Sequence, residues 1–202
     1  MIEKPYTILK YAKSSDGFIG QHNKSIWLTN EFSKRLVHKW RSEVDAILAG
    51  TGTVLTDNPK LTTRYGFNKN PSRVILNRQL NIGVGSNIFN NEAKTIIFTT
   101  KANRISSKDK TTKYIVPNIW ELEEMLSILY SEGIRSIIIE GGQKILNSFV
   151  EKKMWEEARV FTSSKELETG LKAPNLNSKP LSEFRILTDR LQIFKNFKVI
   201  KM

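Results

Sequence analysis

The 202-residue sequence contains no cysteine. This absence excludes disulfide bonds, thiolate metal sites and the zinc-deaminase signature, which requires a Pro-Cys-x-x-Cys pair. Histidine is almost as scarce, since only His22 and His38 are present, and neither has a second ligand at metal spacing. We therefore expect no metal chemistry, and we interpret each histidine as a surface or packing residue.

Long apolar runs and an export signal are lacking as well. No apolar stretch approaches the roughly 20 residues of a membrane span. The N-terminal residues MIEKPYTILKYAKSSDG contain no basic segment followed by an apolar core and a cleavage site. We expect a soluble, cytoplasmic protein without membrane association. The length and the 39% of hydrophobic residues fit a single domain over residues 1–202.

Acidic residues are outnumbered by basic ones, 20 to 32, which gives a formal net charge of +12. Such an excess raises the possibility of nucleic-acid binding. The lysines are scattered, however, and the one short cluster, KANRISSKDKTTK at 101–113, belongs to no basic helix. A lysine-rich solvated surface is the favoured interpretation, and attraction of small phosphorylated ligands fits equally well. We expect no nucleic-acid partner.

Strand and helix patterns alternate along the chain. Strands are predicted at 6–12, 44–49, 73–77, 94–100, 114–116, 136–139, 158–162 and 191–200. Helices are predicted after a cap at Thr29 or Asn30, at 53–58 before Pro59, at about 119–132 before Gly133, and after Gly142. The first helix should bury Phe32, Leu36 and Trp40. This rhythm indicates an α/β fold with parallel strands covered by helices on both faces.

Two glycine-containing stretches follow buried strands, and both are candidates for ligand contact. AILAGTGTVLTDNPKLTTR, at 46–64, offers Gly50 and Gly52 but has Leu55 where a dinucleotide fingerprint needs a third glycine. IIIEGGQKILNSF places Gly141 and Gly142 before a helix whose N-terminus could bind an anion. A tight turn explains the glycine pair at least as well.

Charged residues near these stretches have a functional and a structural interpretation each. Asp57 and Arg64 could form a proton-handling group beside a phosphate clamp, but an ordinary surface ion pair is favoured from these residues alone. Arg41 lies off the predicted apolar face of its helix and could reach a loop or a ligand. Trp27 is as consistent with the core as with a ligand platform.

Taken together, the stretches PYTILKYAKSSDGFI, SIWLTNEFSKRLVHKWR, DAILAGTGTVLTDNPKLTTR, PSRVILN and IIIEGGQKILNSF resemble the riboflavin-biosynthesis pyrimidine reductases. These form the C-terminal domain of bifunctional deaminase-reductases and have a dihydrofolate-reductase-like fold. The resemblance covers most of residues 5–150, with the motifs in family order. It implies a mixed, mostly parallel sheet flanked by helices, and NADPH-dependent reduction of 5-amino-6-(5-phosphoribosylamino)uracil to the ribitylamino compound.

The resemblance also implies the site residues. NADPH contacts are expected from the positions Ala12, Trp27, Thr53, Asp57, Arg78, Gly142, Gln143 and Lys144. Substrate contacts are expected from Ser25, Arg41, Leu61, Arg64 and Glu140. Arg78 suits the 2′-phosphate, and Gly50-x-Gly52 becomes a cofactor loop of the dihydrofolate-reductase type. The segment after residue 150 is only weakly similar to the family, so no site residue is assigned there.

In the expected reaction the ribosylamine opens to an imine, and its C1 receives the hydride. Asp57 is the candidate catalytic residue. It could donate the proton as a general acid, but the favoured role is an ionised group that orients the ligands and stabilises a cationic iminium, with water as the proton source. A homodimer is expected from the family, and a deaminase is absent from this chain, so it could be separate or fused. The alternatives are another NADPH-dependent reductase of the same fold, such as a dihydrofolate reductase, and a basic nucleic-acid-binding protein.

Overall fold

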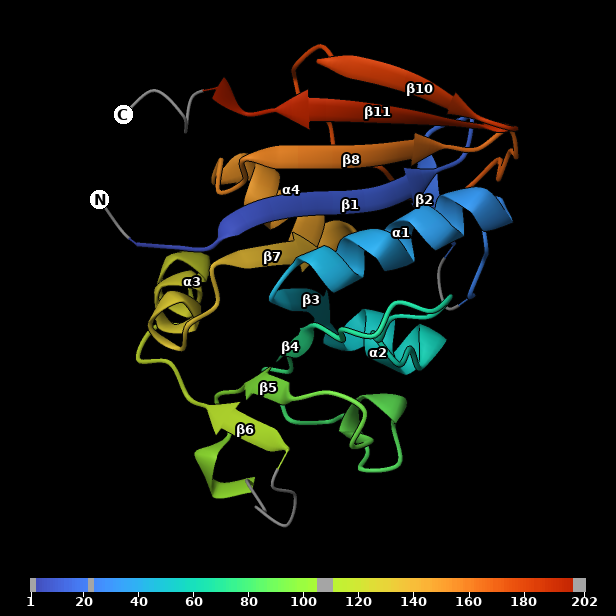
Figure 1. Ribbon diagram of the computed structural model, residues 1–202. Coiled ribbons are helices and arrows are strands. Elements are labelled where there is room, and N and C mark those ends of the chain that lie inside the picture. The colour runs from blue at the N-terminus through green and yellow to red at the C-terminus, as the bar shows by residue number, and fades with distance from the viewer. Residues whose placement is uncertain (1–2, 22–23, 105–110, 198–202) are drawn as a thin grey trace.

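A nine-stranded sheet forms the centre of the computed structural model, which describes residues 3–21, 24–104 and 111–197 (Figure 1). The strand order is β10-β11-β8-β1-β7-β3-β4-β5-β6. All neighbours from β8 to β6 pair in parallel, and β11 and β10 add an antiparallel edge. The strands are β1 (Tyr6–Lys13), β3 (Ala46–Gly50), β4 (Ser72–Leu76), β5 (Thr95–Phe98), β6 (Thr112–Ile115), β7 (Ser136–Ile139), β8 (Glu157–Thr162), β10 (Ser182–Ile186) and β11 (Asp189–Lys195). The predicted mixed, mostly parallel α/β fold is confirmed.

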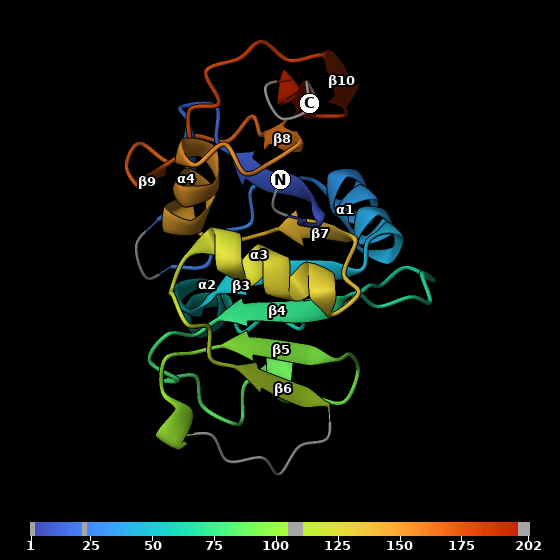
Figure 2. The same cartoon turned by 90° about the vertical axis from the view of Figure 1, so that its left-hand side faces the viewer.

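Helices cover both faces of this sheet, with α1 on one side and α3 and α4 on the other (Figure 2). Their bounds are α1 (Glu31–Glu43), α2 (Thr51–Asp57), α3 (Leu122–Ser131) and α4 (Gln143–Glu151), with 3-10 turns η1 (Asn87–Phe89) and η2 (Ala102–Arg104). A second, two-stranded sheet pairs β2 (Phe18–Gly20) with β9 (Leu171–Lys172). None of the described helices is long and apolar enough to cross a membrane.

Alternation along the strands divides the core into two faces. Leu9 of β1 faces the side on which Leu146 and Phe149 of α4 pack, whereas Ile8 faces Val37 and Trp40 of α1. Every residue of β3 is buried, as expected for a strand with helices on both sides. The third cluster places Val54 of α2, Leu61 and Ile88 on the α1 side of β3, β4 and β5.

Helix α1 begins where predicted, but its buried face differs from the expected one. The Asn30 side chain accepts a hydrogen bond from Ser33 N at 3.0 Å and so caps the helix. Phe32 is 63% exposed, so the prediction that it is buried was wrong. The sheet instead contacts the stripe that contains Ser33, Val37 and Trp40. Of the predicted series, Trp40 is buried and Leu36 is half-buried against this cluster, so the prediction is confirmed at the C-terminal end of the helix and fails at Phe32.

The C-terminal part contains strands that the sequence did not predict. β9 and β10 lie between the predicted strands 158–162 and 191–200, and β2 follows the predicted strand 6–12; no strand was predicted in either segment. The last strand ends at Lys195, and positions 198–200 of the predicted strand lie outside the described residues. His22 and residues 105–110 of the basic cluster also lie outside them. His38 is buried, which agrees with a packing residue.

Candidate active site

Three charged side chains meet where β1 and β7 approach their carboxyl ends. Glu140 directly follows β7, and its carboxylate accepts hydrogen bonds from Arg41 of α1, from Nε at 3.0 Å and from Nη2 at 2.7 Å. Lys10 of β1 places its Nζ 3.6 Å from Glu140 Oε2. The β1–β7 register pairs Leu9 with Ile139, which brings the next residues, Lys10 and Glu140, side by side. The structure thus joins Arg41 and Glu140, both predicted substrate contacts, and adds Lys10.

The electrostatics of this cluster keep Glu140 ionised. Burial alone would raise the pKa of the Glu140 carboxyl, but the charges of Arg41 and Lys10 outweigh burial and lower it from 4.5 to about 2. Burial lowers the pKa of Lys10, and the neighbouring Arg41 adds to this effect, while Glu140 offsets part of it. The side chains of Arg41 and Glu140 are only 14% and 10% exposed. A permanent carboxylate with two cations beside it can hold and orient a polar ligand.

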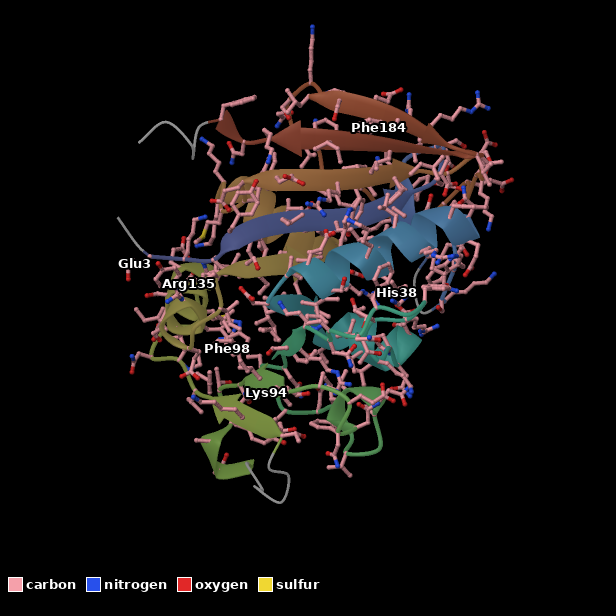
Figure 3. All side chains as sticks on the ribbon, in the orientation of Figure 1. Glu3, His38, Lys94, Phe98, Arg135 and Phe184 are labelled. Carbon is pink, nitrogen blue, oxygen red and sulfur yellow. The ribbon has the colours of Figure 1, made fainter. Side chains whose placement is uncertain are left out.

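The loop of residues 58–66, here called the substrate loop, lies beside this cluster. Arg41 Nη1 donates to Thr62 O at 3.1 Å, which ties α1 to the loop. Within it Leu61 is buried and Arg64 is exposed. His38 of α1, labelled in Figure 3, packs edge-on against the Tyr65 ring with 5.2 Å between ring centres. Three predicted substrate residues, Arg41, Leu61 and Glu140, therefore belong to one connected region, with Arg64 on its exposed rim.

Two helix N-termini adjoin each other at the same end of the sheet. α2 starts after Gly50 and α4 after Gly142, and no side chain of the described residues caps either helix. A Cβ added to Gly142 would lie 3.7 Å from Thr53 Oγ1, so the two first turns are neighbours. The free N–H groups of α4 and its dipole favour an anion there. Thr53 and Gly142, both predicted cofactor contacts, are thus brought together.

The glycines of the two stretches have a packing role. A Cβ on Gly50 would lie 2.5 Å from Ile145 Cδ1, and one on Gly141 would lie 2.8 Å from Ile145 Cβ and Cγ2. Among the described residues no atom lies within 4 Å of a Cβ on Gly52. Gly50 and Gly141 therefore let α4 approach the ends of β3 and β7 closely, as the closest-packed glycine of a dinucleotide fold does. The Gly50-x-Gly52 turn itself has only one glycine that its surroundings require.

None of the remaining predicted residues forms a hydrogen bond or ion pair with Arg41 or Glu140 in the described part of the chain. Trp27 is 58% exposed, which excludes the core interpretation, and Ser25 is exposed beside it. Arg78 follows β4, and its guanidinium lies 5.5 Å from the centre of the Trp120 ring. Asp57 ends α2 in an exposed position and forms no ion pair with Arg64 among the described residues. The last predicted residues are distributed as follows: Ala12 is half-buried on β1, Gln143 Nε2 donates to Lys172 O at 2.9 Å, and Lys144 is exposed.

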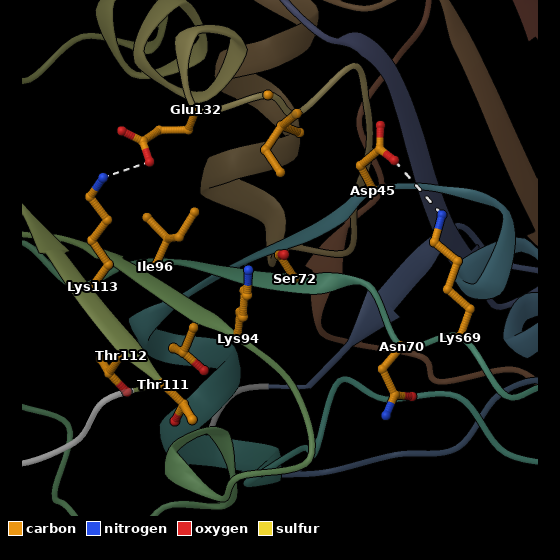
Figure 4. A pocket seen from close by; sticks show the side chains of 13 residues that line it. Asp45, Lys69, Asn70, Ser72, Lys94, Ile96, Thr111, Thr112, Lys113 and Glu132 are labelled. Atoms are coloured by element: carbon orange, nitrogen blue, oxygen red, sulfur yellow. Dashed lines mark hydrogen bonds and ion pairs between the residues drawn. The ribbon is translucent and has the colours of Figure 1, made fainter.

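A pocket of about 640 Å³ lies elsewhere on the molecule, at the opposite end of β4, β5 and β6 (Figure 4). Two of its lysines already have carboxylate partners, Lys69 with Asp45 at 3.8 Å and Lys113 with Glu132 at 2.5 Å. Lys94 projects between these pairs. The charges of the acidic and basic residues that line the pocket nearly cancel. The pocket lies at the end of the strands that is opposite to their carboxyl ends. This pocket is not part of the candidate active site.

Sequence reasoning missed Lys10 and the hydrogen bond to Thr62 O. Lys10 lies between Ile8 and Ala12 on the buried α1 side of β1, so a single charge interrupts an otherwise apolar face. That interruption is a usable signal, because buried lysines in strands have charged partners. The acceptor at Thr62 is a backbone carbonyl, which every residue has, so the residue type at this position does not indicate the hydrogen bond.

Comparison with known proteins places these features in a family. The family described as the RibD C-terminal domain matches residues 5–167. A 2,5-diamino-6-ribosylamino-4(3H)-pyrimidinone 5′-phosphate reductase of Aquifex aeolicus is 33% identical over 172 residues, which cover 79% of this chain and 77% of that protein. The riboflavin biosynthesis protein RibD of the same organism is 31% identical over 90% of this chain and 52% of its own length. The chain therefore spans about half of the RibD proteins that it matches.

Solved structures agree with this placement. A deaminase/5-amino-6-(5-phosphoribosylamino)uracil reductase from Thermotoga maritima superposes with a TM-score of 0.81 at 29% identity, over 95% of this chain and 56% of that one. The riboflavin biosynthesis reductase of Saccharomyces cerevisiae shares the fold, with a TM-score of 0.80 at 23% identity, over 95% of this chain and 90% of that one.

Proposed function

The chain belongs to the RibD C-terminal domain family, and from this premise we propose that it reduces 5-amino-6-(5-phosphoribosylamino)uracil to the ribitylamino compound in riboflavin biosynthesis, with NADPH as reductant. The observation that carries the proposal is the Arg41–Glu140–Lys10 cluster beside the uncapped N-terminus of α4, at the carboxyl ends of parallel strands. Open α/β sheets bind ligands at this end.

The residues around α4 suit a dinucleotide phosphate. Gly142, Gln143 and Lys144 present an uncapped helix N-terminus, and Thr53 contributes a hydroxyl from the adjacent first turn. When bound, NADPH supplies the hydride. Arg78, exposed after β4, is proposed for the 2′-phosphate. Ala12 and Trp27 complete the proposed cofactor contacts.

Substrate binding is assigned to the cluster and the substrate loop. Glu140, ionised and partly buried, accepts hydrogen bonds from the substrate, while Arg64 offers an exposed guanidinium to its phosphate. Ser25 and Leu61 flank the bound molecule. Asp57 remains the proposed catalytic carboxylate: it orients the ligands and stabilises the cationic iminium, and water delivers the proton. A homodimer, a cytoplasmic location and a separate or fused deaminase are part of the same proposal.

The names of the relatives also favour a second substrate. The Aquifex aeolicus reductase, with which the chain shares most of its length, acts on the 2,5-diaminopyrimidinone phosphate. This molecule carries an amino group where the uracil carries an oxygen. The order of reduction and deamination would then be reversed.

The test is NADPH oxidation, followed at 340 nm, with the purified protein and three candidate substrates. We expect turnover with the phosphoribosylaminouracil and none with dihydrofolate. Faster turnover of the diaminopyrimidinone phosphate would replace the first substrate by the second. Turnover of dihydrofolate alone would assign another reductase of this fold. Duplex DNA binding without any NADPH binding would favour the nucleic-acid alternative.

A further inference from the structure

Arg73 of β4 is a fully buried arginine outside the site described above, with 0% of its surface exposed. Its Nε donates to Lys60 O at 2.8 Å, and its Nη1 donates to Ile88 O at 2.8 Å and to Asn90 O at 2.9 Å. Nη2 donates to the side-chain oxygen of Asn90. Among the described residues Arg73 forms no ion pair, so hydrogen bonds to backbone, amide and hydroxyl oxygens, together with the more distant charge of Glu92, compensate its charge.

Such an arrangement costs more than an apolar side chain at the same position would. We therefore interpret the arginine at this position by the hydrogen-bond geometry that its planar guanidinium imposes. The fork joins two segments that are distant in sequence: the substrate loop and residues 87–93, here called the buttress. Asn87 reinforces the junction, because its backbone N–H donates to Asn58 Oδ1 at 2.8 Å and its side chain donates to Asn58 O at 2.7 Å.

The substrate loop needs such support because its backbone is strained. Asn58, Leu61 and Tyr65 have φ angles of 40°, 53° and 64°, in the left-handed region that residues with a Cβ rarely adopt. Conformations of this kind persist only where surrounding contacts fix them. Arg73 holds the carbonyl of Lys60 on one side of Leu61, and Arg41 holds the carbonyl of Thr62 on the other.

We propose that Arg73 is a positioning residue of the reductase: by binding Lys60 O and the buttress together, it fixes the strained loop so that Leu61 and Arg64 face the substrate. Arg73 touches neither ligand and acts through the loop. The inference rests on the proposed function in so far as Leu61 and Arg64 bind substrate. The loop geometry itself can be measured independently of activity.

The experiment compares Arg73→Met with Arg73→Lys in the full chain. Arg73→Met keeps the apolar volume but removes every donor, so the KM for the phosphorylated substrate should rise about 10- to 100-fold, because small misplacements of binding groups have effects of this size. The KM for NADPH should change less than about threefold, since α4 is untouched. Arg73→Lys can restore one donor but not the fork, and it should recover part of the lost affinity.

Tryptic cleavage after Arg64, followed by mass spectrometry of the native protein, reports the loop directly. We expect it to be about tenfold faster in Arg73→Met, because local opening exposes the chain to the protease. The matched control is Leu129→Ala, which opens a cavity under α3 on the other face of the sheet. It should lower the melting temperature while leaving substrate KM and Arg64 cleavage as in the wild type.

Asn90→Ala serves if Arg73→Met does not fold, because it removes one acceptor of Arg73, that of Nη2, together with the hydrogen bond that the same oxygen accepts from Glu92 N. It should shift both readouts in the same direction, by about threefold. A folded Arg73→Met, or otherwise Asn90→Ala, with wild-type KM and cleavage would overturn the proposal, as would equal shifts in Leu129→Ala. Absence of reductase activity in the wild-type protein would refute the proposed function. Faster cleavage after Arg64 in Arg73→Met would support the role of Arg73 in the loop even then.

Discussion

Arg41 contacts the substrate loop and Arg64 belongs to it, but the two side chains differ in solvation, and this separates their roles. Arg41 is 14% exposed, and its Nε, Nη1 and Nη2 already donate to Glu140 and Thr62 O. Arg64 is exposed. The guanidinium of Arg64 is therefore available to the phosphate of the substrate, whereas Arg41 chiefly holds Glu140 in place.

Two alanine variants test this division. Arg64→Ala should weaken binding of the phosphorylated substrate by about 10- to 150-fold, which is the contribution of one charge-assisted hydrogen bond. Binding of the dephosphorylated substrate should not change. Arg41→Ala leaves Glu140 buried without its main partner, so it should cost about 3 to 5 kcal/mol of unfolding free energy and impair both substrates. KM values and urea unfolding provide the measurements. An equal loss of affinity for the phosphorylated and the dephosphorylated substrate in Arg64→Ala would contradict the phosphate role.

His38 makes the stability of the protein depend on pH. Burial, and after it the positive charges of Arg41 and Arg64, lowers its pKa from 6.5 to about 4. Between these two pH values the unfolded chain binds a proton that the native chain does not, so stability falls as the pH falls, by at most about 3 kcal/mol. Glu140, with its pKa lowered to about 2, loses its contribution only below about pH 4.5 and in the same direction.

Urea unfolding between pH 4.5 and 7 measures this slope. We expect His38→Gln to flatten it, because the glutamine does not titrate. His22→Gln is the control, as it removes the other histidine of the chain. A His38→Gln protein with the wild-type slope would show that another group is responsible.

At the scale of elements, the approach of α4 to the sheet depends on two glycines and one isoleucine. A Cβ at position 50 would meet only the Cδ1 end of Ile145, whereas a Cβ at position 141 would meet its Cβ and Cγ2. Both Gly50→Ala and Gly141→Ala should therefore destabilise the fold, by roughly 1 to 3 kcal/mol. Ile145→Val removes Cδ1 alone. It should rescue Gly50→Ala and leave Gly141→Ala unrescued.

Unfolding free energies of the two double variants against the singles decide this prediction. Ile145→Val should also restore the affinity for NADPH in Gly50→Ala and not in Gly141→Ala, because Gly141→Ala has to displace the N-terminus of α4. Rescue of both variants by Ile145→Val would mean that α4 is free to shift.

The elements themselves were predictable where a segment carries its own reason for folding. The run Ile137 to Ile139 is buried on both sides, and Gly133, with φ 87°, ends α3 as predicted. β10 has no such signal: its central residues are exposed, and it exists because β11 pairs with it. Edge strands of this kind depend on their partner more than on their own composition.

The site was predictable only in part, for a related reason. Arg41 and Glu140 were identified through the resemblance, and their pairing could not be read from positions 99 residues apart. Lys10 joins them through the β1–β7 register, which is a tertiary property. Phe32 was placed in the core because its spacing to Leu36 is helical. The sheet contacts Trp40 as predicted, but in the first turns it contacts Ser33 and Val37, so Phe32 is left exposed.

The whole molecule carries a net charge of +12, and both proposed ligands are anions. Spread over the surface, such a charge attracts phosphorylated ligands over distances comparable to the Debye length, which falls from about 30 Å at 0.01 M salt to about 8 Å at 0.15 M. We therefore expect kcat/KM for the phosphorylated substrate to fall about tenfold over this range. The value of kcat should stay constant, because salt screens the encounter and leaves the bound complex unchanged.

The dephosphorylated substrate is the control and should show a much smaller dependence of kcat/KM on salt. A kcat/KM that is independent of salt would mean that the charge serves solubility alone, and duplex DNA affinity falling about 10³-fold or more between 50 and 200 mM salt would point to a nucleic-acid track.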